Sequence, residues 1–171
     1  MLDWHEPTYE SDFPRYLDFL DRQLQELLTR YGPIGGVWFD GAWSRPQSDW
    51  RLEEIYDRMH TLQPAALVGN NHHVVPLPGE DFQIYEGAFP EEVQYGGKVV
   101  PRAEMPAEIC AKLGPTWFYG NNGYRADRER AAWLLDAAAS RDLNLLLNVP
   151  PAPDGRIDDG YWTALRDLRR V

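Results

Sequence analysis

The chain has 171 residues, of which 43% are hydrophobic and 26% charged, and this composition is typical of one globular domain rather than of a disordered segment. Its net charge of −10 argues against nucleic acid as a partner, because phosphate binding requires clusters of Lys and Arg. The single cysteine, Cys110, excludes an internal disulfide framework. No apolar run reaches the roughly 20 residues of a membrane span.

Aromatic residues are abundant, at 13% of the chain with seven Trp and nine Tyr. Ring faces that stack on the C–H faces of a sugar would explain them, and so would a Trp-rich core.

The first segments of the chain predict a loop, a helix and a buried strand. Residues 1–9 are read as the end of a strand that runs into a loop. A helix is expected over residues 12–31, because Asp12 can cap it and Pro14 suits its first turn. Its apolar residues fall on one face at helical spacing. The short apolar run Ile34–Phe39 then predicts a buried strand that ends at a carboxylate, Asp40.

The remaining segments continue the alternation of helices and strands. Expected along the chain are a helix over residues 49–62, a strand over Ala65–Gly69, an extended piece over Phe82–Glu86, a strand over Thr116–Tyr119, a helix over residues 127–141 and a strand over Leu143–Val149.

This alternation predicts βα units and a parallel sheet, and so an α/β fold. Polar residues follow the strands directly, as they do at the C-terminal face of a (β/α)₈ barrel, where active sites lie. These residues are Asp40, Asn70 to His73, Glu86, Asn121, Asn122 and Asn148. Only about five strands are predicted, whereas a closed barrel needs about eight, so we expect a partial (β/α)₈ barrel.

Asp40 is the first candidate for chemistry. It follows Trp38-Phe39 at the end of a buried strand and precedes Gly41, which would hold it rigidly and partly desolvated. By itself, an Asp before a Gly is also common as a turn residue.

The surrounding residues extend the pattern around Asp40. A segment Arg30-Tyr31-Gly32-Pro33-Ile34 leads into Val37-Trp38-Phe39-Asp40-Gly41. Further segments are Asp3-Trp4-His5-Glu6-Pro7, Asp81-Phe82-Gln83-Ile84-Tyr85-Glu86, Glu108-Ile109-Cys110, Trp117-Phe118-Tyr119 and Leu143-Asn144-Leu145-Leu146-Leu147-Asn148. Together they resemble the α-L-fucosidase family of glycoside hydrolases, in the C-terminal half of its catalytic barrel. The sequence departs from the family where Leu143 and Phe118 replace Gly, where Ala107 replaces Trp, and where Asn70-Asn71-His72-His73 replaces a run similar to Asn-Asp-Arg.

The resemblance implies a retaining mechanism with two carboxyl groups. Asp40 corresponds to the nucleophile of the family. Glu86 corresponds to the glutamate that serves as acid/base in well-studied branches of the family, and Glu108 is the alternative acid/base. No cofactor is expected.

The resemblance also implies residues that bind the sugar, and we expect Trp4, His5, Trp38, His72 and His73 among them. Trp4 and His5 could equally anchor a loop, and at most one of the two adjacent histidines is expected to contact sugar hydroxyls. No metal site is expected, because adjacent residues of a strand point to opposite sides and no further His or Cys completes a ligand set.

The resemblance therefore implies a retaining exo-glycoside hydrolase that releases α-L-fucose from glycans or glycoconjugates through a covalent glycosyl-enzyme. Residues 1–171 would form the C-terminal portion of the catalytic domain, without its N-terminal half, as a truncated copy. The alternative is a non-catalytic remnant that binds a sugar or a partner chain, and a weaker alternative is a barrel hydrolase for another sugar. No signal peptide opens the chain, and members of this family are often secreted, periplasmic or lysosomal.

Overall fold

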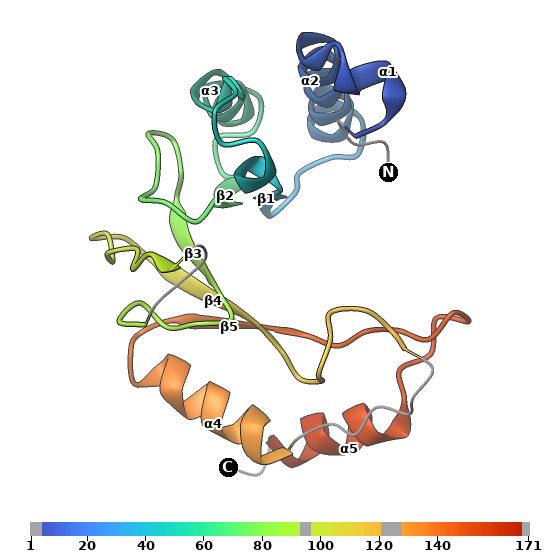
Figure 1. Cartoon of the computed structure of the whole chain (residues 1–171), viewed down its shortest axis with the longest axis vertical. Helices are drawn as coiled ribbons and strands as arrows, with labels where there is room; N and C mark the ends of the chain where they lie inside the picture. Colours follow the sequence, from blue (N-terminus) through green and yellow to red (C-terminus); the bar gives the residue numbers. More distant parts are fainter. Residues whose placement is uncertain (1–4, 93–96, 121–127, 169–171) are drawn as a thin grey trace. The chain divides into compact units, whose positions relative to one another are not determined.

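The structure, a computed structural model, describes residues 5–92, 97–120 and 128–168. The chain forms two compact units (Figure 1). Unit 1 comprises residues 1–72 and 76–82, and unit 2 comprises residues 73–75 and 83–171. No helix in the described ranges has both the length and the apolar character needed to cross a membrane.

Unit 1 contains two parallel strands and the helices that cover them. Its elements in chain order are α1 (Pro7–Glu10), α2 (Phe13–Arg30), β1 (Gly36–Asp40), the 3-10 helix η1 (Ala42–Ser44), α3 (Leu52–Leu62) and β2 (Leu67–Asn71). β1 pairs in parallel with β2, with Gly36 opposite Leu67 and Asp40 opposite Asn71. The helices predicted over 12–31 and 49–62 and the strands predicted over 34–39 and 65–69 are confirmed, with bounds shifted by up to three residues. The strand end predicted within residues 1–9 is not found in the described part, where residues 5 and 6 form a turn and a bend and α1 follows; residues 1–4 lie outside the described residues.

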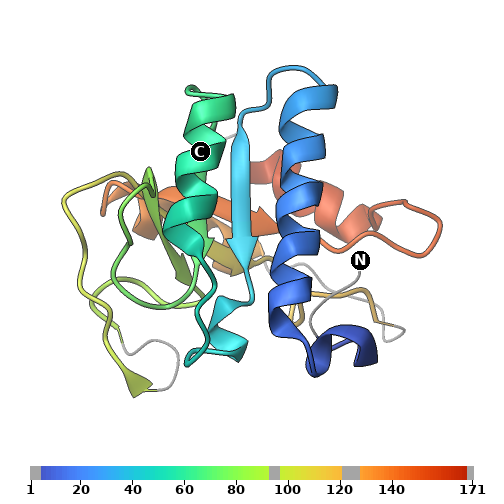
Figure 2. The ribbon, with the colours of Figure 1, turned by 90° about the horizontal axis from the view of Figure 1, so that it is seen from above.

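The local sequence explains how α2 begins and how it is anchored. The Asp12 side chain accepts a hydrogen bond from the backbone N of Arg15 at 3.2 Å and so caps the helix. At the far end, the Gln63 side chain donates to the carbonyl oxygens of Leu28 and Gly32. Figure 2 shows α2 and α3 lying along β1. Their apolar faces and one face of the two strands form the core of unit 1, which includes Leu24, Leu28, Ile55, Tyr56, Met59 and Val68, with Val37 and Phe39 packed against it.

Unit 2 contains three parallel strands and two helices. β3 (Phe82–Glu86), whose first residue belongs to unit 1, is followed by β4 (Ala107–Lys112), α4 (Arg128–Ala139), β5 (Asn144–Asn148) and α5 (Asp159–Leu168). β4 pairs in parallel with β3 on one side and with β5 on the other. In the register, Glu86 lies opposite Cys110 and Lys112 lies opposite Asn148.

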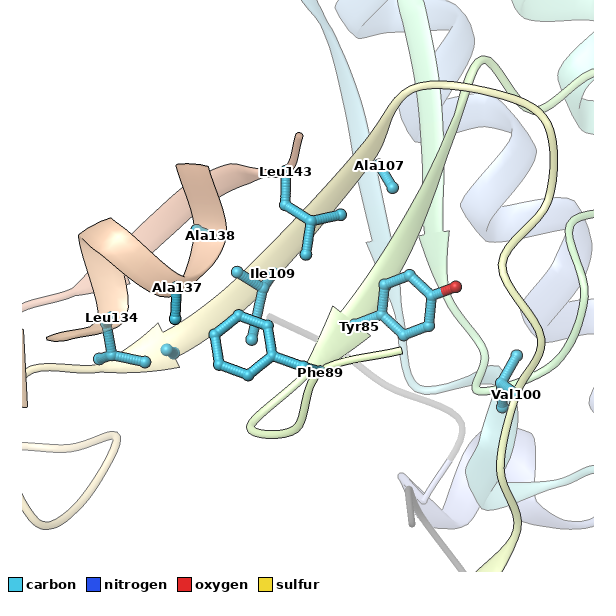
Figure 3. Packing of buried hydrophobic residues seen from close by; sticks show 10 residues of the cluster. Tyr85, Phe89, Val100, Ala107, Ile109, Leu134, Ala137, Ala138 and Leu143 are labelled. Atoms are coloured by element: carbon cyan, nitrogen blue, oxygen red, sulfur yellow. The ribbon is translucent and has the colours of Figure 1, made fainter. Parts of the chain in front are cut away.

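The core of unit 2 lies between one face of these strands and α4. Figure 3 shows Ile109 and Leu143 near the buried alanines Ala137 and Ala138 of α4, with Phe89 beside Ile109, while the ring of Tyr85, a member of the same cluster, lies on the side of Val100. A second cluster joins α5 to the end of β4 and consists of Leu113, Ala131, Tyr161 and Ala164. Because Tyr85 and Ile109 face this core, alternation along the strands directs Glu86, Glu108, Cys110 and Lys112 to the opposite face.

Three features differ from the sequence prediction. The strand predicted over Thr116–Tyr119 is wrong, because residues 116–118 form bends, Tyr119 has no regular structure, and the strand lies over Ala107–Lys112. Burial of both faces explains the error: Ala107 to Ala111 are all buried, although the run contains an ionisable residue and lacks an apolar pattern. Helices α1 and α5 were not predicted, and the start predicted for α4 at residue 127 lies outside the described residues.

The predicted fold class is confirmed as an α/β partial (β/α)₈ barrel. The described residues contain five strands, fewer than the eight of a closed barrel, and every registered pair within a unit is parallel. Most residues of β2, β3 and β4 are buried, whereas those of β1 and β5 are exposed or half-buried. Val37 and Leu145 are only half-buried, and Leu146 is 42% exposed.

Candidate active site

Polar side chains occupy the last position of every strand. In unit 1, β1 ends at Asp40 and β2 ends at Asn71. In unit 2, β3 ends at Glu86, β4 at Lys112 and β5 at Asn148. Buried apolar strands that end in polar groups place those groups at the carboxyl edge of a parallel sheet, the edge at which α/β barrels carry out chemistry.

Asp40 is held through one of its two carboxyl oxygens. Oδ1 accepts hydrogen bonds from the backbone N of Gly41 at 2.8 Å, from the indole Nε1 of Trp43 at 2.9 Å and from Nδ2 of Asn71 at 3.2 Å. Among the described residues, none donates to Oδ2. Three donors on one oxygen orient the carboxylate and leave the second oxygen to react.

The turn after β1 places these donors. Gly41 adopts φ +94°, a left-handed conformation that suits glycine, and lets the chain turn at once into η1. The Ser44 hydroxyl donates to the Gly41 carbonyl at 2.6 Å and closes the turn, which brings Trp43 back over Asp40. The expectation of a partly desolvated Asp40 is wrong for this chain, because the residue is exposed.

Trp38 lies two residues before Asp40 on the same strand. Since Val37 and Phe39 pack toward the helices of unit 1, strand alternation directs Trp38 and Asp40 to the opposite face. Trp38 is half-buried, so its ring borders the face that carries the carboxylate. Its predicted contact with the sugar is compatible with this position and stays a prediction.

Glu86 contacts a histidine within unit 2. Its Oε2 lies 3.3 Å from Nε2 of His73, a residue whose side chain is only 6% exposed, whereas the Glu86 side chain is 31% exposed. The carboxyl group is therefore reachable from solvent but is held from one side. Asp40 and Glu86 belong to different units, and their separation stays a prediction.

Glu108, the alternative acid/base, does not lie at the carboxyl end of its strand. It lies opposite Ile84 in the register, two residues before Glu86, which corresponds to about 7 Å along a strand. It is buried, and its Oε2 accepts a hydrogen bond from Nδ2 of Asn144 at 2.6 Å. Asn144 is the first residue of β5, so this contact lies toward the amino end of the sheet. The position favours a structural role for Glu108.

His72 joins a buried polar network in unit 1. Its Nε2 lies 2.8 Å from Oε1 of Glu80, which also accepts from the Tyr56 hydroxyl at 3.0 Å. Asn70 donates to the same hydroxyl at 2.7 Å. Burial raises the pKa of Tyr56, with Glu80 adding to the rise and the hydrogen bond from Asn70 opposing it. This network ties the loop after β2 to α3, and the sugar contact predicted for His72 stays a prediction.

Of the two remaining candidates, His5 is exposed, and Trp4 lies outside the described residues.

Two side chains near the strand ends were missed by sequence reasoning. Trp43 lies three residues after Asp40, which is a usable signal because such a residue can fold back over a turn. Lys112 ends β4, where its Nζ donates to the Pro115 carbonyl at 3.2 Å and lies 5.7 Å from the ring centre of Trp117. Asn148 donates to the carbonyl of Trp117 and secures the same loop.

Comparison with known proteins identifies relatives along nearly the whole chain. The pattern of the family described as Alpha-L-fucosidase matches residues 1–170. Alpha-L-fucosidase 1 of Arabidopsis thaliana is 28% identical over 99% of this chain. The solved alpha-L-fucosidase isoenzyme 1 of Paenibacillus thiaminolyticus is 30% identical and superposes with a TM-score of 0.72 over 92% of the chain.

A more distant structure has the same fold. It is an alpha-L-fucosidase of Bacteroides thetaiotaomicron, solved as a trapped covalent intermediate with 2-fluoro-fucosyl fluoride, and it is 21% identical with a TM-score of 0.72 over 98% of the chain. The chain spans 37% of the length of the Arabidopsis relative and 38% and 41% of the two solved chains.

Proposed function

Because the chain belongs to the alpha-L-fucosidase family, we propose that it carries the two catalytic carboxyl groups of a retaining, exo-acting α-L-fucosidase. In this proposal residues 1–171 correspond to the C-terminal portion of the catalytic barrel. The observation that carries the proposal is the geometry of Asp40, a carboxylate at the end of β1 with three donors on Oδ1.

Asp40 is the nucleophile of this mechanism. Its Oδ2 attacks the anomeric carbon while the bond from that carbon to the leaving oxygen breaks, and a covalent glycosyl-enzyme results. The donors on Oδ1 support the role, since they fix the direction from which Oδ2 approaches. The name of the Bacteroides relative, which records a trapped covalent intermediate, also supports a two-step mechanism.

Glu86 is the acid/base. In the first step it gives its proton to the leaving oxygen, and in the second it takes a proton from the water that attacks the anomeric carbon and releases Asp40. The position of Glu86 at the end of β3 and its partly exposed carboxyl group support this role. The buried Glu108, already bonded to Asn144, is less suited to exchange protons with substrate and water.

The proposed substrate is a fucosylated oligosaccharide or glycoconjugate. The activity in the names of the relatives supports this class, as does the 2-fluoro-fucosyl fluoride in the name of the Bacteroides structure. Trp38 is proposed to contact the sugar, because it shares the face of Asp40 on β1. Trp4, His5 and His72 remain in the proposed substrate-binding set, with His73 as the alternative to His72.

Hydrolysis of an activated aryl α-L-fucoside tests the proposal in two forms of the protein. One is the chain alone, and the other is a chimera in which residues 1–171 replace the matching segment of the Paenibacillus relative, which supplies the rest of a barrel. We expect the chimera to release the aryl group and Asp40→Ala in the same chimera to abolish release. A chimera that folds cooperatively and shows no turnover on the α-L-fucoside overturns the proposal.

A second candidate function is a non-catalytic domain that binds a sugar or a partner chain. The exposure of Asp40 and the incomplete cover of β1 and β5 favour it for the isolated chain. The two functions are separated by titrating the chain and the chimera with an iminocyclitol of the kind bound by a solved bacterial fucosidase, together with the turnover assay. Saturable binding by the chain and by the chimera, with turnover by neither, supports the second function.

A further inference from the structure

His73 has an unusual backbone conformation directly after the end of β2. Its φ is +61°, and only two other non-glycine residues of the described chain, Arg51 and Asp142, have a positive φ. L-residues avoid this region because Cβ approaches the neighbouring carbonyl oxygen, although His is among the residues found there more often. Such a conformation persists where the surroundings impose it, and it is concentrated at functional sites.

The side chain of His73 contacts the carboxyl group of Glu86. The ring is buried, and Nε2 lies 3.3 Å from Oε2 of Glu86, thirteen residues further along the chain. The preceding residue, His72, has its ring on Glu80 instead. The two adjacent histidines therefore contact different carboxylates, and the one with the positive φ contacts Glu86.

We propose that His73 is a positioning residue for Glu86, holding Oε2 by a hydrogen bond from its Nε2–H. The inference rests on the proposed function, in which Glu86 is the acid/base. A glutamate side chain that is 31% exposed can rotate about three bonds, whereas a general acid must present its proton within hydrogen-bond reach of the leaving oxygen. The buried His73 ring restricts that rotation, and its effect should appear only in steps that use the proton of Glu86.

This role differs measurably from a purely structural one. A structural residue affects all substrates alike, because its loss reduces the amount or the shape of the folded enzyme. A residue that acts through the general acid affects poor leaving groups most, because an activated aryl group departs without protonation. The ratio of kcat/KM for an activated fucoside to that for an unactivated fucoside therefore reports on His73, and kcat/KM describes only the first, bond-breaking step.

The catalytic test uses His73→Leu and the donor-retaining His73→Gln in the form of the protein that turns over aryl fucosides. For His73→Leu we expect kcat/KM on a poor leaving group to fall by about 10- to 100-fold and kcat/KM on an activated one by less than about threefold. His73→Gln should recover part of the loss. The matched control is His60→Leu, which removes a histidine that contacts the Gly79 carbonyl and Asp81 and should change the ratio little.

A double-mutant cycle with Glu86→Ala shows whether the effect passes through Glu86. If it does, His73→Leu should cause almost no further loss on the poor leaving group when Glu86 is already absent. The contact itself is checked in the 171-residue chain by NMR, in which Glu86→Gln should shift the ring signals of His73 and Glu108→Gln should not.

Equal losses on both substrates, additive losses in the cycle or unchanged ring signals each overturn the role of His73. A different result would contradict the proposed function itself: a Glu86→Ala variant that keeps its full activity on poor leaving groups.

Discussion

The indole nitrogen of Trp43 lies 2.9 Å from Oδ1 of Asp40, the same oxygen that accepts from Gly41 and Asn71. Three donors from a turn, from η1 and from β2 thus converge on a single atom. Because Oδ1 is occupied, the carboxylate can use only Oδ2 toward a substrate without breaking a hydrogen bond. This arrangement, together with the polar ends of the strands, yields three predictions beyond the test of His73, and the buried network of Tyr56 yields two more.

Trp43→Phe should reduce kcat/KM on an aryl α-L-fucoside. The substitution keeps an aromatic ring and removes one donor to a charged acceptor, a loss of about 1.5–3 kcal/mol, or about 10- to 150-fold. The matched control is Trp50→Phe in the same loop, because the indole of Trp50 donates to the Arg45 carbonyl and not to Asp40. Equal losses in the two variants would show that the donor to Asp40 has no special role.

Asp40→Ala should abolish turnover of the aryl fucoside, since no covalent intermediate can form without a nucleophile. Added azide should restore some activity and yield a fucosyl azide of inverted configuration, because a small anion can occupy the space of the lost carboxylate. The product is identified by NMR of its anomeric proton. Wild-type turnover by Asp40→Ala would contradict the assignment of the nucleophile.

Glu86→Ala should behave differently from Asp40→Ala. With a good leaving group the intermediate still forms, but its hydrolysis slows because the base is missing. Azide should then give a product of retained configuration. Glu108→Gln serves as the comparison, as it keeps an acceptor for Asn144, and its kcat/KM should stay within about threefold of wild type. If a Glu108 variant, and not Glu86→Ala, gave an azide product of retained configuration, Glu108 would be the acid/base instead of Glu86.

Tyr56→Phe should destabilise unit 1, because it removes the donor to Glu80 and the acceptor for Asn70 in a buried network. The expected loss at neutral pH is about 1–3 kcal/mol of the free energy of unfolding, measured by urea denaturation. Tyr31→Phe is the control, because Tyr31 is 68% exposed. A similar loss in both variants would contradict the importance of the network.

The same variant predicts a dependence on pH. Burial raises the pKa of Tyr56 in the folded state, so its stabilising contribution is complete below the unfolded value of about 10 and declines as pH rises toward the folded value. The stability difference between wild type and Tyr56→Phe should therefore shrink above about pH 10, by up to about 1.4 kcal/mol per pH unit. A difference that stays constant from pH 8 to 11 would show that the hydroxyl is not buried as described.

The local sequence was sufficient to predict those helices and strands whose sequence patterns involve only neighbouring residues. The helix capped by Asp12 and the strand Phe82–Glu86 were predicted because capping and apolar patterning depend on neighbouring residues. The strand Ala107–Lys112 was not, because burial on both faces removes the alternation that a half-exposed strand displays. The run Thr116–Tyr119 has the aromatic and β-branched residues typical of a strand, yet it follows Gly114-Pro115 and residues 116–118 form bends.

The sequence by itself determined the alternation of strands and helices, the family, and the placement of Asp40 and Glu86 at strand ends, since each depends on residue types at fixed spacing. Only the tertiary structure decided which partners these carboxylates have. Asn71 reaches Asp40 across a pair of parallel strands, and His73 reaches Glu86 from a loop. His72 and His73 are identical side chains in adjacent positions. The chain segments that folding brings near them place His72 in a buried network with Glu80 and place His73 beside Glu86, a proposed catalytic group.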